Sequence, residues 1–328
     1  MTKWVRAHTN IALIKYWGKE NEEWIIPKNN SLSLTLDAFY TDTQVIFDKT
    51  LKEDELILDN VMQNASALNK VQRVLDEVRS QAGIQLKARV ESKNHVPTAA
   101  GLASSASGLA ALAGAASQAA GLSLSDTELS KLARIGSGSA SRSIYGGFAE
   151  WVKGHDHDSS FAVPVDDADW DIGMLFVIVN DAVKEVSSRD GMRRTVETSP
   201  FYQGWLDSLD KDLRDMKAAI SERDIEKVGS IAERNALKMH ATTLGANPPF
   251  TYWTAESMTA MTAVRDLRKQ EYTAYFTMDA GPNVKIICRQ SQLTDIKDKL
   301  RPLFTDDQLI EARPGPGLHL VDQSQPTI

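Results

Sequence analysis

The spacing of hydrophobic residues changes several times along the first half of the chain and predicts strands interleaved with helices. Residues 31–36 alternate polar and apolar, and residues 43–47 have the Thr, Val and Ile content of a half-buried strand. Apolar residues recur at helical spacing over 65–78, and alternation returns over 84–90. An alanine-rich run with little charge, 102–120, predicts a buried helix.

Ser125 and Glu128 have the spacing of a capping box and predict a short helix that ends near Ile135. A nearly continuous apolar run over 172–179 predicts a buried strand. The rest of the second half predicts three helices, at 201–220, 225–240 and 253–269, and a strand pair at 272–278 and 284–288.

The mixture predicts an α+β protein, and 328 residues suit two domains. An acidic loop with Asp166, Asp167 and Asp169 precedes the apolar run. We therefore expect an N-terminal domain of residues 1–170 and a C-terminal domain of residues 171–328.

Composition narrows the classes of function. The net charge of −7 argues against a general nucleic-acid binder, because such a protein needs a basic face. No run of 18 apolar residues occurs, so no membrane span or signal peptide is predicted. Cys288 is the single cysteine and lies in an apolar run, which predicts a buried thiol and a cytoplasmic protein. His155 and His157 flank acidic residues and are expected on the solvated surface.

The most informative segment is PTAAGLASSAS, residues 97–107, which leads directly into the alanine-rich helix. A loop of small residues that opens into a helix presents backbone N–H groups at the positive end of the helix dipole, which favours phosphate. The segment matches neither a Walker A loop nor GxGxxG. The alternative is a Ser/Ala-rich helix start that only packs tightly.

The chain contains three further motifs: NIALIKYWGK at 10–19, GSGSASRS at 136–143 and MDAGPNVK at 278–285. Their order along the chain is that of one known family. Together with the phosphate loop, they make the chain resemble the GHMP kinase superfamily and, within it, the mevalonate diphosphate decarboxylases of the bacterial type. The resemblance covers nearly the whole chain. It implies a two-domain α+β fold with the active site in the cleft between the domains.

The resemblance also implies the reaction. ATP would phosphorylate the tertiary 3-hydroxyl of (R)-mevalonate 5-diphosphate, and loss of phosphate and CO2 would give isopentenyl diphosphate. ATP is then a co-substrate with Mg²⁺ on its phosphates, and Ser105 or Ser107 is the candidate hydroxyl beside the metal. The small-molecule substrate is the expected partner, and a homodimer is implied.

By resemblance, Asp279 is the catalytic acid/base, since it follows a predicted strand in a Gly/Pro-flanked turn. Taken alone, that aspartate could simply cap the turn. Arg142 would bind the substrate carboxylate, because a guanidinium pairs well with carboxylate or phosphate. Its alternative is an exposed arginine in a flexible loop. Lys184 would stabilise the transferred phosphate.

The remaining site residues fall into two groups. By resemblance, the substrate phosphates would be bound by Tyr16, Lys19, Ser137, Ser139, Ser188 and Arg189. The last two lie in a locally basic segment, 184–194, whose alternative is a solvated basic helix face. ATP would be bound by Ser92, Pro97, Ala100, Gly101, Leu102, Ala103, Ser104, Ser105 and Ser107.

Two other functions stay open from the sequence. A GHMP kinase, such as mevalonate kinase or a mevalonate 3-kinase, would stop at the phosphate ester. A non-catalytic relative would sense nucleotides or metabolites, bind ATP and show no turnover.

Overall fold

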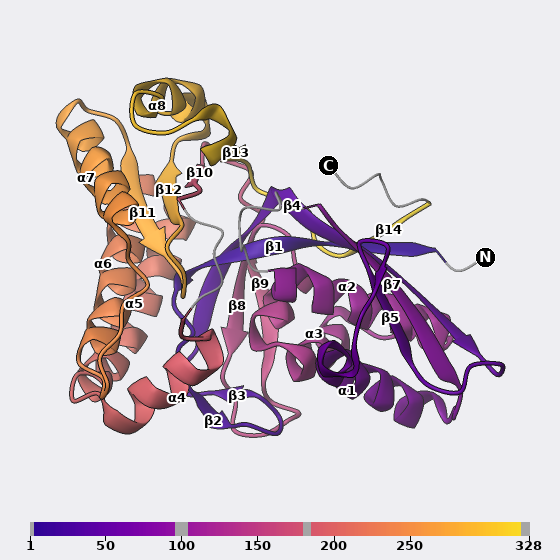
Figure 1. The fold of residues 1–328 in the computed structure, drawn as a ribbon. Coiled ribbons are helices and arrows are strands. Elements are labelled where there is room, and N and C mark those ends of the chain that lie inside the picture. The colour runs from indigo at the N-terminus through magenta and orange to yellow at the C-terminus, as the bar shows by residue number, and fades with distance from the viewer. Residues whose placement is uncertain (1–2, 96–103, 180–184, 323–328) are drawn as a thin grey trace.

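The computed structural model describes residues 3–95, 104–179 and 185–322 (Figure 1). Eight strands of this part form one sheet, in the order β14-β1-β4-β7-β5-β6, with β8 beside β4 and β9 beside β8. The bounds of these strands are β1 Trp4–Ile14, β4 Ser31–Asp48, β5 Glu55–Leu58, β6 Val61–Met62, β7 Lys87–His95, β8 Phe148–Val152, β9 Phe161–Asp166 and β14 His319–Val321.

Three helices pack under this sheet, and a hairpin and a 3-10 helix lie beside it (Figure 1). The bounds are β2 Lys19–Asn21, β3 Ile26–Pro27, α1 Ala65–Ala82, α2 Ser104–Ala119, α3 Asp126–Gly136 and η1 Gly138–Ile144. Alanines of α2, such as Ala110 and Ala113, are buried against Val5 of β1 and Val90 of β7. The small side chains of α2 let it lie close to the sheet, which explains its alanine content.

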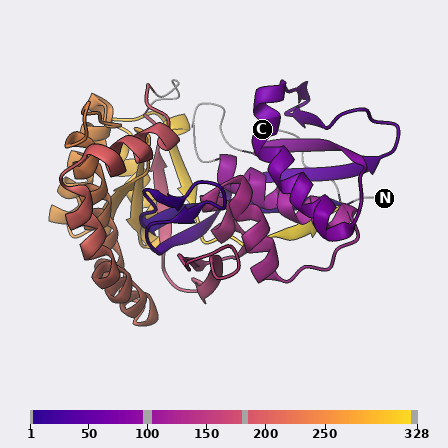
Figure 2. The ribbon, with the colours of Figure 1, turned by 90° about the horizontal axis from the view of Figure 1, so that it is seen from below.

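A second sheet has four strands, in the order β11-β12-β10-β13. The remaining helices lie with it in the half of the molecule away from the first sheet (Figure 2). Apolar residues at helical spacing bury α7 and α8 against it, as the sequence pattern requires. The bounds are β10 Gly173–Val177, α4 Ser188–Thr198, α5 Tyr202–Ser221, α6 Ile225–Leu244, α7 Ala255–Lys269, β11 Ala274–Met278, β12 Val284–Cys288, η2 Gln290–Gln292, α8 Leu293–Leu300, η3 Asp306–Gln308 and β13 Leu309–Ala312.

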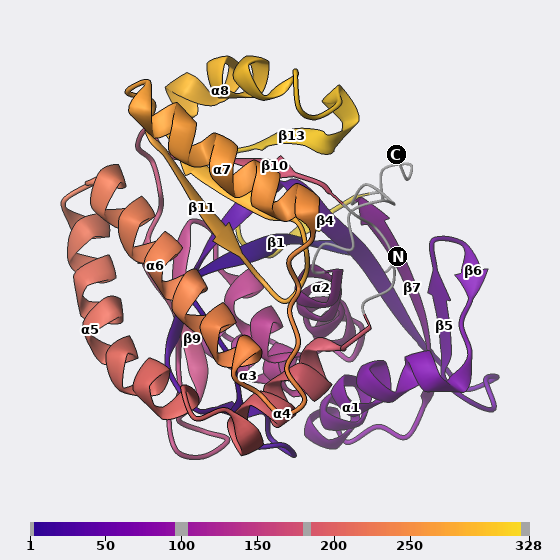
Figure 3. The same ribbon diagram turned by 60° about the vertical axis from the view of Figure 1, so that its left-hand side comes forward.

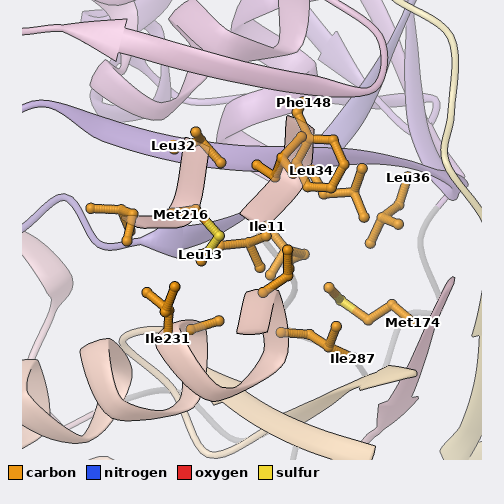
Figure 4. Close-up of a cluster of buried hydrophobic side chains, with 14 of the residues drawn as sticks. Ile11, Leu13, Leu32, Leu34, Leu36, Phe148, Met174, Met216, Ile231 and Ile287 are labelled. Carbon is orange, nitrogen blue, oxygen red and sulfur yellow. The ribbon is translucent and has the colours of Figure 1, made fainter. Parts of the chain in front are cut away.

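An apolar core joins the two sheets (Figure 4). Ile11 and Leu13 of β1 meet Met216 of α5, Ile231 of α6 and Ile287 of β12, all of them buried. Burial of this kind contributes about 25 cal/mol per Å² of apolar surface, so the contact holds the end of β1 firmly against the helices. The position of this strand end decides where the site residues lie.

The structure confirms the α+β class and most of the expected elements. The capping box of Ser125 and Glu128 begins α3, and β12 has the expected bounds. Residues 31–36 and 43–47 are both strand, as expected, and they belong to a single long strand, β4. Its exposed middle residue, Asp37, accepts a bond from the Arg313 amide at 2.7 Å, so the polar stretch does not end the strand.

The polypeptide passes from the first sheet to the second between Asp166, the end of β9, and Gly173, the start of β10. It later returns, since Leu320 of β14 pairs with Val5 of β1. Cys288 is fully buried, as expected. No helix within the described residues is long and apolar enough to cross a membrane.

Candidate active site

Asp279 lies between two lysines that come from different sheets. It follows the last residue of β11, and its Oδ2 is 3.2 Å from Nζ of Lys285 on the neighbouring strand β12. Its Oδ1 is 2.8 Å from Nζ of Lys15, the first residue after β1. Both ammonium groups are buried, whereas 37% of the Asp279 side chain is exposed. The carboxylate is therefore open to a ligand from one side only.

The two lysines determine the charge of this carboxylate. Burial alone would raise the pKa of Asp279, but Lys15 and Lys285 outweigh burial and hold this pKa well below its usual range. Burial lowers the pKa of Lys15 to about 8, against the opposing influence of Asp279. Near pH 7, Asp279 is thus an ionised carboxylate beside two ammonium groups. One of them, that of Lys15, loses its proton at a lower pH than is usual for lysine.

The backbone also fixes both ammonium groups. Lys15 Nζ donates to the carbonyl of Ala12 at 2.7 Å, and Lys285 Nζ donates to the carbonyl of Asn283 at 3.2 Å. Neither lysine was expected at the site from the sequence alone. A signal was available, because each lies in a strongly apolar run, IALIKYW or VKIIC, and lysine is rarely buried without a partner.

Arg142 lies in η1 and is 2% exposed, so it is not the flexible loop arginine of the alternative hypothesis. Its Nε donates to Oγ of Ser33 at 2.9 Å and to Oδ1 of Asn10 at 3.3 Å, and its Nη1 donates to Oγ of Ser31 at 2.5 Å. Among the described residues, its Nη2 has no hydrogen-bond partner. The arginine thus keeps one nitrogen for a ligand.

Burial lowers the pKa of Arg142 to about 10, while Asp279 and Tyr16 act in the opposite direction. The guanidinium therefore stays charged near neutral pH. Gly138 lets η1 approach the sheet, since a Cβ at this position would lie 2.5 Å from the Trp151 ring. Substitution of this glycine would push away the helix that carries Arg142.

Tyr16 packs edge-on against Trp151, with 4.9 Å between the ring centroids. Burial raises the pKa of Tyr16 well above its usual range, while the cations Arg142 and Arg189 lower it. The fold thus brings Tyr16 near two expected ligands of anions. The neighbouring Trp17 is buried.

The other expected substrate ligands come from three segments. Lys19 begins the β2–β3 hairpin and pairs with Glu22 of the same hairpin. Ser188 and Arg189 form the first turn of α4, behind the capping residue Ser187. The hydroxyls of Ser137 and Ser139 lie 3.3 Å apart where α3 gives way to η1.

The start of α2 contains no acidic residue in its first turn, and Ser105 there is exposed. The Ser107 hydroxyl is buried and lies 2.9 Å from Oγ1 of Thr41, so it already has a partner in the sheet. The Ser92 hydroxyl likewise lies 2.7 Å from Oγ1 of Thr43. Among the described hydroxyls at this helix start, that of Ser105 is therefore the exposed one.

Several expected site residues lie outside the described residues. They are Pro97, Ala100, Gly101, Leu102, Ala103 and Lys184, and the side chain of Ser104 also falls outside the description. Within residues 3–95, 104–179 and 185–322, no group of three or more His, Cys, Asp or Glu side chains could hold a metal ion. This part of the chain thus offers a magnesium ion no such carboxylate cluster.

Two family models together match most of the chain. Residues 7–162 match a diphosphomevalonate decarboxylase-like N-terminal domain, and residues 174–319 match a mevalonate 5-diphosphate decarboxylase C-terminal domain. The diphosphomevalonate decarboxylase of Homo sapiens is 35% identical over 303 residues, which cover 85% of this chain and 75% of the human protein.

Solved structures resemble the fold closely. A mevalonate diphosphate decarboxylase from Staphylococcus aureus has a TM-score of 0.94 and 51% identity, with 97% of each chain covered. A complex described as MDDEF with MVAPP, AMPPCP and magnesium has a TM-score of 0.93 and 56% identity, and it covers 98% of this chain and 99% of the other.

Proposed function

The chain belongs to the diphosphomevalonate decarboxylase family, and on this premise we propose that it catalyses the ATP-dependent decarboxylation of (R)-mevalonate 5-diphosphate. The products are isopentenyl diphosphate, ADP, phosphate and CO2. The higher identity to the staphylococcal than to the human protein supports the bacterial type.

One observation carries this assignment: an ionised carboxylate that is open on one side and a charged guanidinium whose Nη2 has no partner among the described residues influence each other electrostatically. The reaction needs both groups. Asp279 accepts the hydrogen bond of the tertiary hydroxyl, and Arg142 Nη2 donates to the carboxylate that later leaves as CO2. A kinase without decarboxylation would have no use for a guanidinium reserved for that carboxylate.

The low pKa of Asp279 limits its strength as a base. Its first task is to orient the hydroxyl oxygen toward the γ-phosphorus, and it takes the proton as the new P–O bond forms and the bond to ADP breaks. The C–C bond to the carboxylate then breaks, its electrons form the carbon–carbon double bond, and the 3-phosphate departs. Phosphorylation is needed because phosphate leaves more readily than a tertiary alkoxide.

The 5-diphosphate end is assigned to the ligands from the hairpin, η1 and α4. Arg189 and Tyr16 lie within electrostatic reach of each other, and Lys19 reaches the same region from β2. Substrate binding exchanges the Lys19–Glu22 pair for a stronger pair with phosphate. The proposed ligands are Tyr16, Lys19, Ser137, Ser139, Ser188 and Arg189, with Lys184 assigned to the transferred phosphate.

The start of α2 suits the phosphates of ATP, since its first turn holds no acidic residue and its Ser105 hydroxyl is exposed. We assign Ser105, rather than Ser107, to the phosphates or to metal-bound water. Magnesium on the ATP phosphates supplies charge neutralisation during phosphoryl transfer. The other proposed nucleotide ligands remain Ser92, Pro97, Ala100, Gly101, Leu102, Ala103 and Ser104.

Family membership supports a proposal for the assembly, and the single buried thiol supports one for the cellular location. We place the enzyme in the cytoplasm as a homodimer, with mevalonate 5-diphosphate as its partner molecule. Sedimentation at micromolar concentration tests the dimer.

Product analysis tests the proposed function. The native chain, given mevalonate 5-diphosphate and Mg-ATP, is expected to release CO2, phosphate and ADP in equal amounts. Asp279→Asn should lower the rate about 10²- to 10⁴-fold, whereas the exposed control Asp295→Asn should not. ADP without CO2 would indicate a kinase, and ATP binding without turnover would indicate a sensor.

A further inference from the structure

Helix α6 lies beside β1 (Figure 3). It carries one fully buried amide, that of Asn235, among the apolar residues between the two sheets. Its neighbours on the same helix, Ile231, Ala232 and Met239, belong to the apolar cluster that also holds Ile14 of β1. A buried amide destabilises such a core unless each of its polar atoms finds a partner. Apolar packing therefore does not explain why position 235 holds an asparagine.

The partners of Asn235 are specific. Its Oδ1 accepts from the backbone N–H of Lys15 at 2.9 Å, and its Nδ2 donates to Oδ2 of Asp212 at 2.8 Å. Asp212, on α5, is itself buried and accepts from Lys238 Nζ at 2.5 Å, with Arg234 Nη2 at 3.5 Å from its other oxygen. An ionised carboxylate only accepts hydrogen bonds, so Asp212 forces the amide oxygen to face Lys15.

The Lys15 amide depends on this bond because of its place in the chain. The β1 ladder ends at Ile14, which pairs with Leu32, so Lys15 lies beyond the strand partners. Its carbonyl accepts from Nδ2 of Asn29 at 2.8 Å. Both backbone polar groups of Lys15 are thus held by buried asparagine side chains, and its ammonium group reaches Asp279.

We infer that Asn235, oriented by Asp212, is a positioning residue that fixes the end of β1 so that the Lys15 ammonium stays against Asp279. The inference rests on the proposed function for its effect on rate, but not for its effect on geometry. Lys15 and Asp279 come from segments 264 residues apart, and the Asn235 bond ties Lys15 to the half of the molecule that carries Asp279.

Loss of this bond has two expected consequences. A leucine at position 235 leaves the Lys15 N–H buried without an acceptor, so the end of β1 shifts to reach water or another acceptor. A displacement of about 1 Å at a catalytic group costs up to about 100-fold in rate. Asp279 also loses part of the influence of Lys15, so its pKa rises toward the ordinary range.

The test compares Asn235→Leu and Asp212→Asn with Thr242→Val. Thr242 is a matched control, because it is buried on α6 and bonds only within that helix, to the Met239 carbonyl at 2.6 Å. We expect kcat to fall about 10- to 100-fold in Asn235→Leu. Its KM values should change less than about threefold and its acidic limb should move to higher pH. Asp212→Asn should show a smaller loss of the same kind, and Thr242→Val should lower only Tm.

Folded Asn235→Leu and Asp212→Asn enzymes with the native kcat and acidic limb would overturn the inference. Should Asn235→Leu fail to fold, Asp212→Asn carries the test, since it preserves shape and lets the amide turn. It also removes the carboxylate charge that pairs with Lys238 and Arg234, so its unfolding is measured alongside its kinetics. Crystal structures give a readout that does not depend on turnover. A Lys15 Nζ–Asp279 Oδ1 distance unchanged at 2.8 Å in the variants contradicts the inference even if the native chain releases no CO2, a result that would refute the proposed function alone.

Discussion

Arg134 and Arg142 lie eight residues apart, both are buried, and burial lowers the pKa of each to about 10. Neither forms an ion pair with a carboxylate among the described residues. Arg134 nevertheless uses all its nitrogens. Nε donates to the Trp24 carbonyl at 3.0 Å, Nη1 donates to the Ser160 carbonyl, and Nη2 lies 2.8 Å from Nδ1 of His157.

Arg142 differs in how its donors are used. Two of its nitrogens bond to Ser31, Ser33 and Asn10, and Nη2 has no partner in the described part of the chain. Burial alone thus does not separate a structural arginine from a ligand-binding one. The separating property is whether every nitrogen of the guanidinium finds a partner in the protein itself.

The largest expected effect is the loss of activity when Arg142 is substituted. Arg142→Lys keeps the charge but loses the planar fork, so CO2 release should fall about 10²- to 10³-fold, which corresponds to about 3–4 kcal/mol of barrier. Steady-state kinetics with Mg-ATP measures this loss. Activity within a few-fold of the native chain would mean that Arg142 serves structure, as Arg134 does.

Arg134→Met should show the opposite behaviour. The carbonyls of Trp24 and Ser160 lose their donor, so the free energy of unfolding should fall by about 2–4 kcal/mol. The kcat of the folded enzyme should stay within about threefold of the native value. Urea unfolding together with kinetics measures both, and a large loss of kcat with native stability would contradict the comparison.

Ser33→Ala sharpens the comparison by removing a partner of Arg142. It removes the 2.9 Å acceptor of Nε, which leaves the guanidinium freer to turn. We expect kcat/KM to fall about 3- to 10-fold, since one such bond contributes about 1 kcal/mol. Ser117→Ala is the control, because its buried hydroxyl bonds only to the Ala113 carbonyl of its own helix. Equal effects of the two substitutions would refute a specific role for Ser33.

The smallest expected effect concerns pH. Burial and then the charge of Arg134 lower the pKa of His157 below its usual 6.5. The unfolded chain therefore binds the proton more readily, and the stabilising contribution of neutral His157 is present above pH 6.5 and is lost as pH falls below it. His157→Gln should flatten the loss of Tm between pH 7 and pH 5, whereas the exposed His155→Gln should not. Identical pH profiles would contradict this account.

The sequence predicted best what depends on neighbouring residues. The capping box of α3, the apolar strand β12 and the position of Asp279 after a strand are all local features. The expected solvated surface holds for His155, which is exposed, whereas His157 is half-buried because it contacts Arg134, 23 residues earlier on another element.

For the same reason, the residues that surround Asp279 could not be predicted from the sequence. Lys15 and Asp279 are 264 residues apart, and Asn235 and Lys15 are 220 apart. A pattern along the chain contains no information about which buried polar groups will meet. The motifs therefore indicated the reaction, while the packing of the two sheets determined which lysines surround the carboxylate.

The most direct test of the central claim is calorimetric binding of mevalonate 5-diphosphate and of an analogue with a carboxamide in place of the carboxylate. The native chain should prefer the carboxylate about 10- to 100-fold, because a hydrogen bond to a charged group contributes about 1.5–3 kcal/mol. Arg142→Gln should lose this preference, while Arg134→Met should keep it. An Arg142→Gln enzyme that retains the native preference would show that Arg142 does not bind the carboxylate.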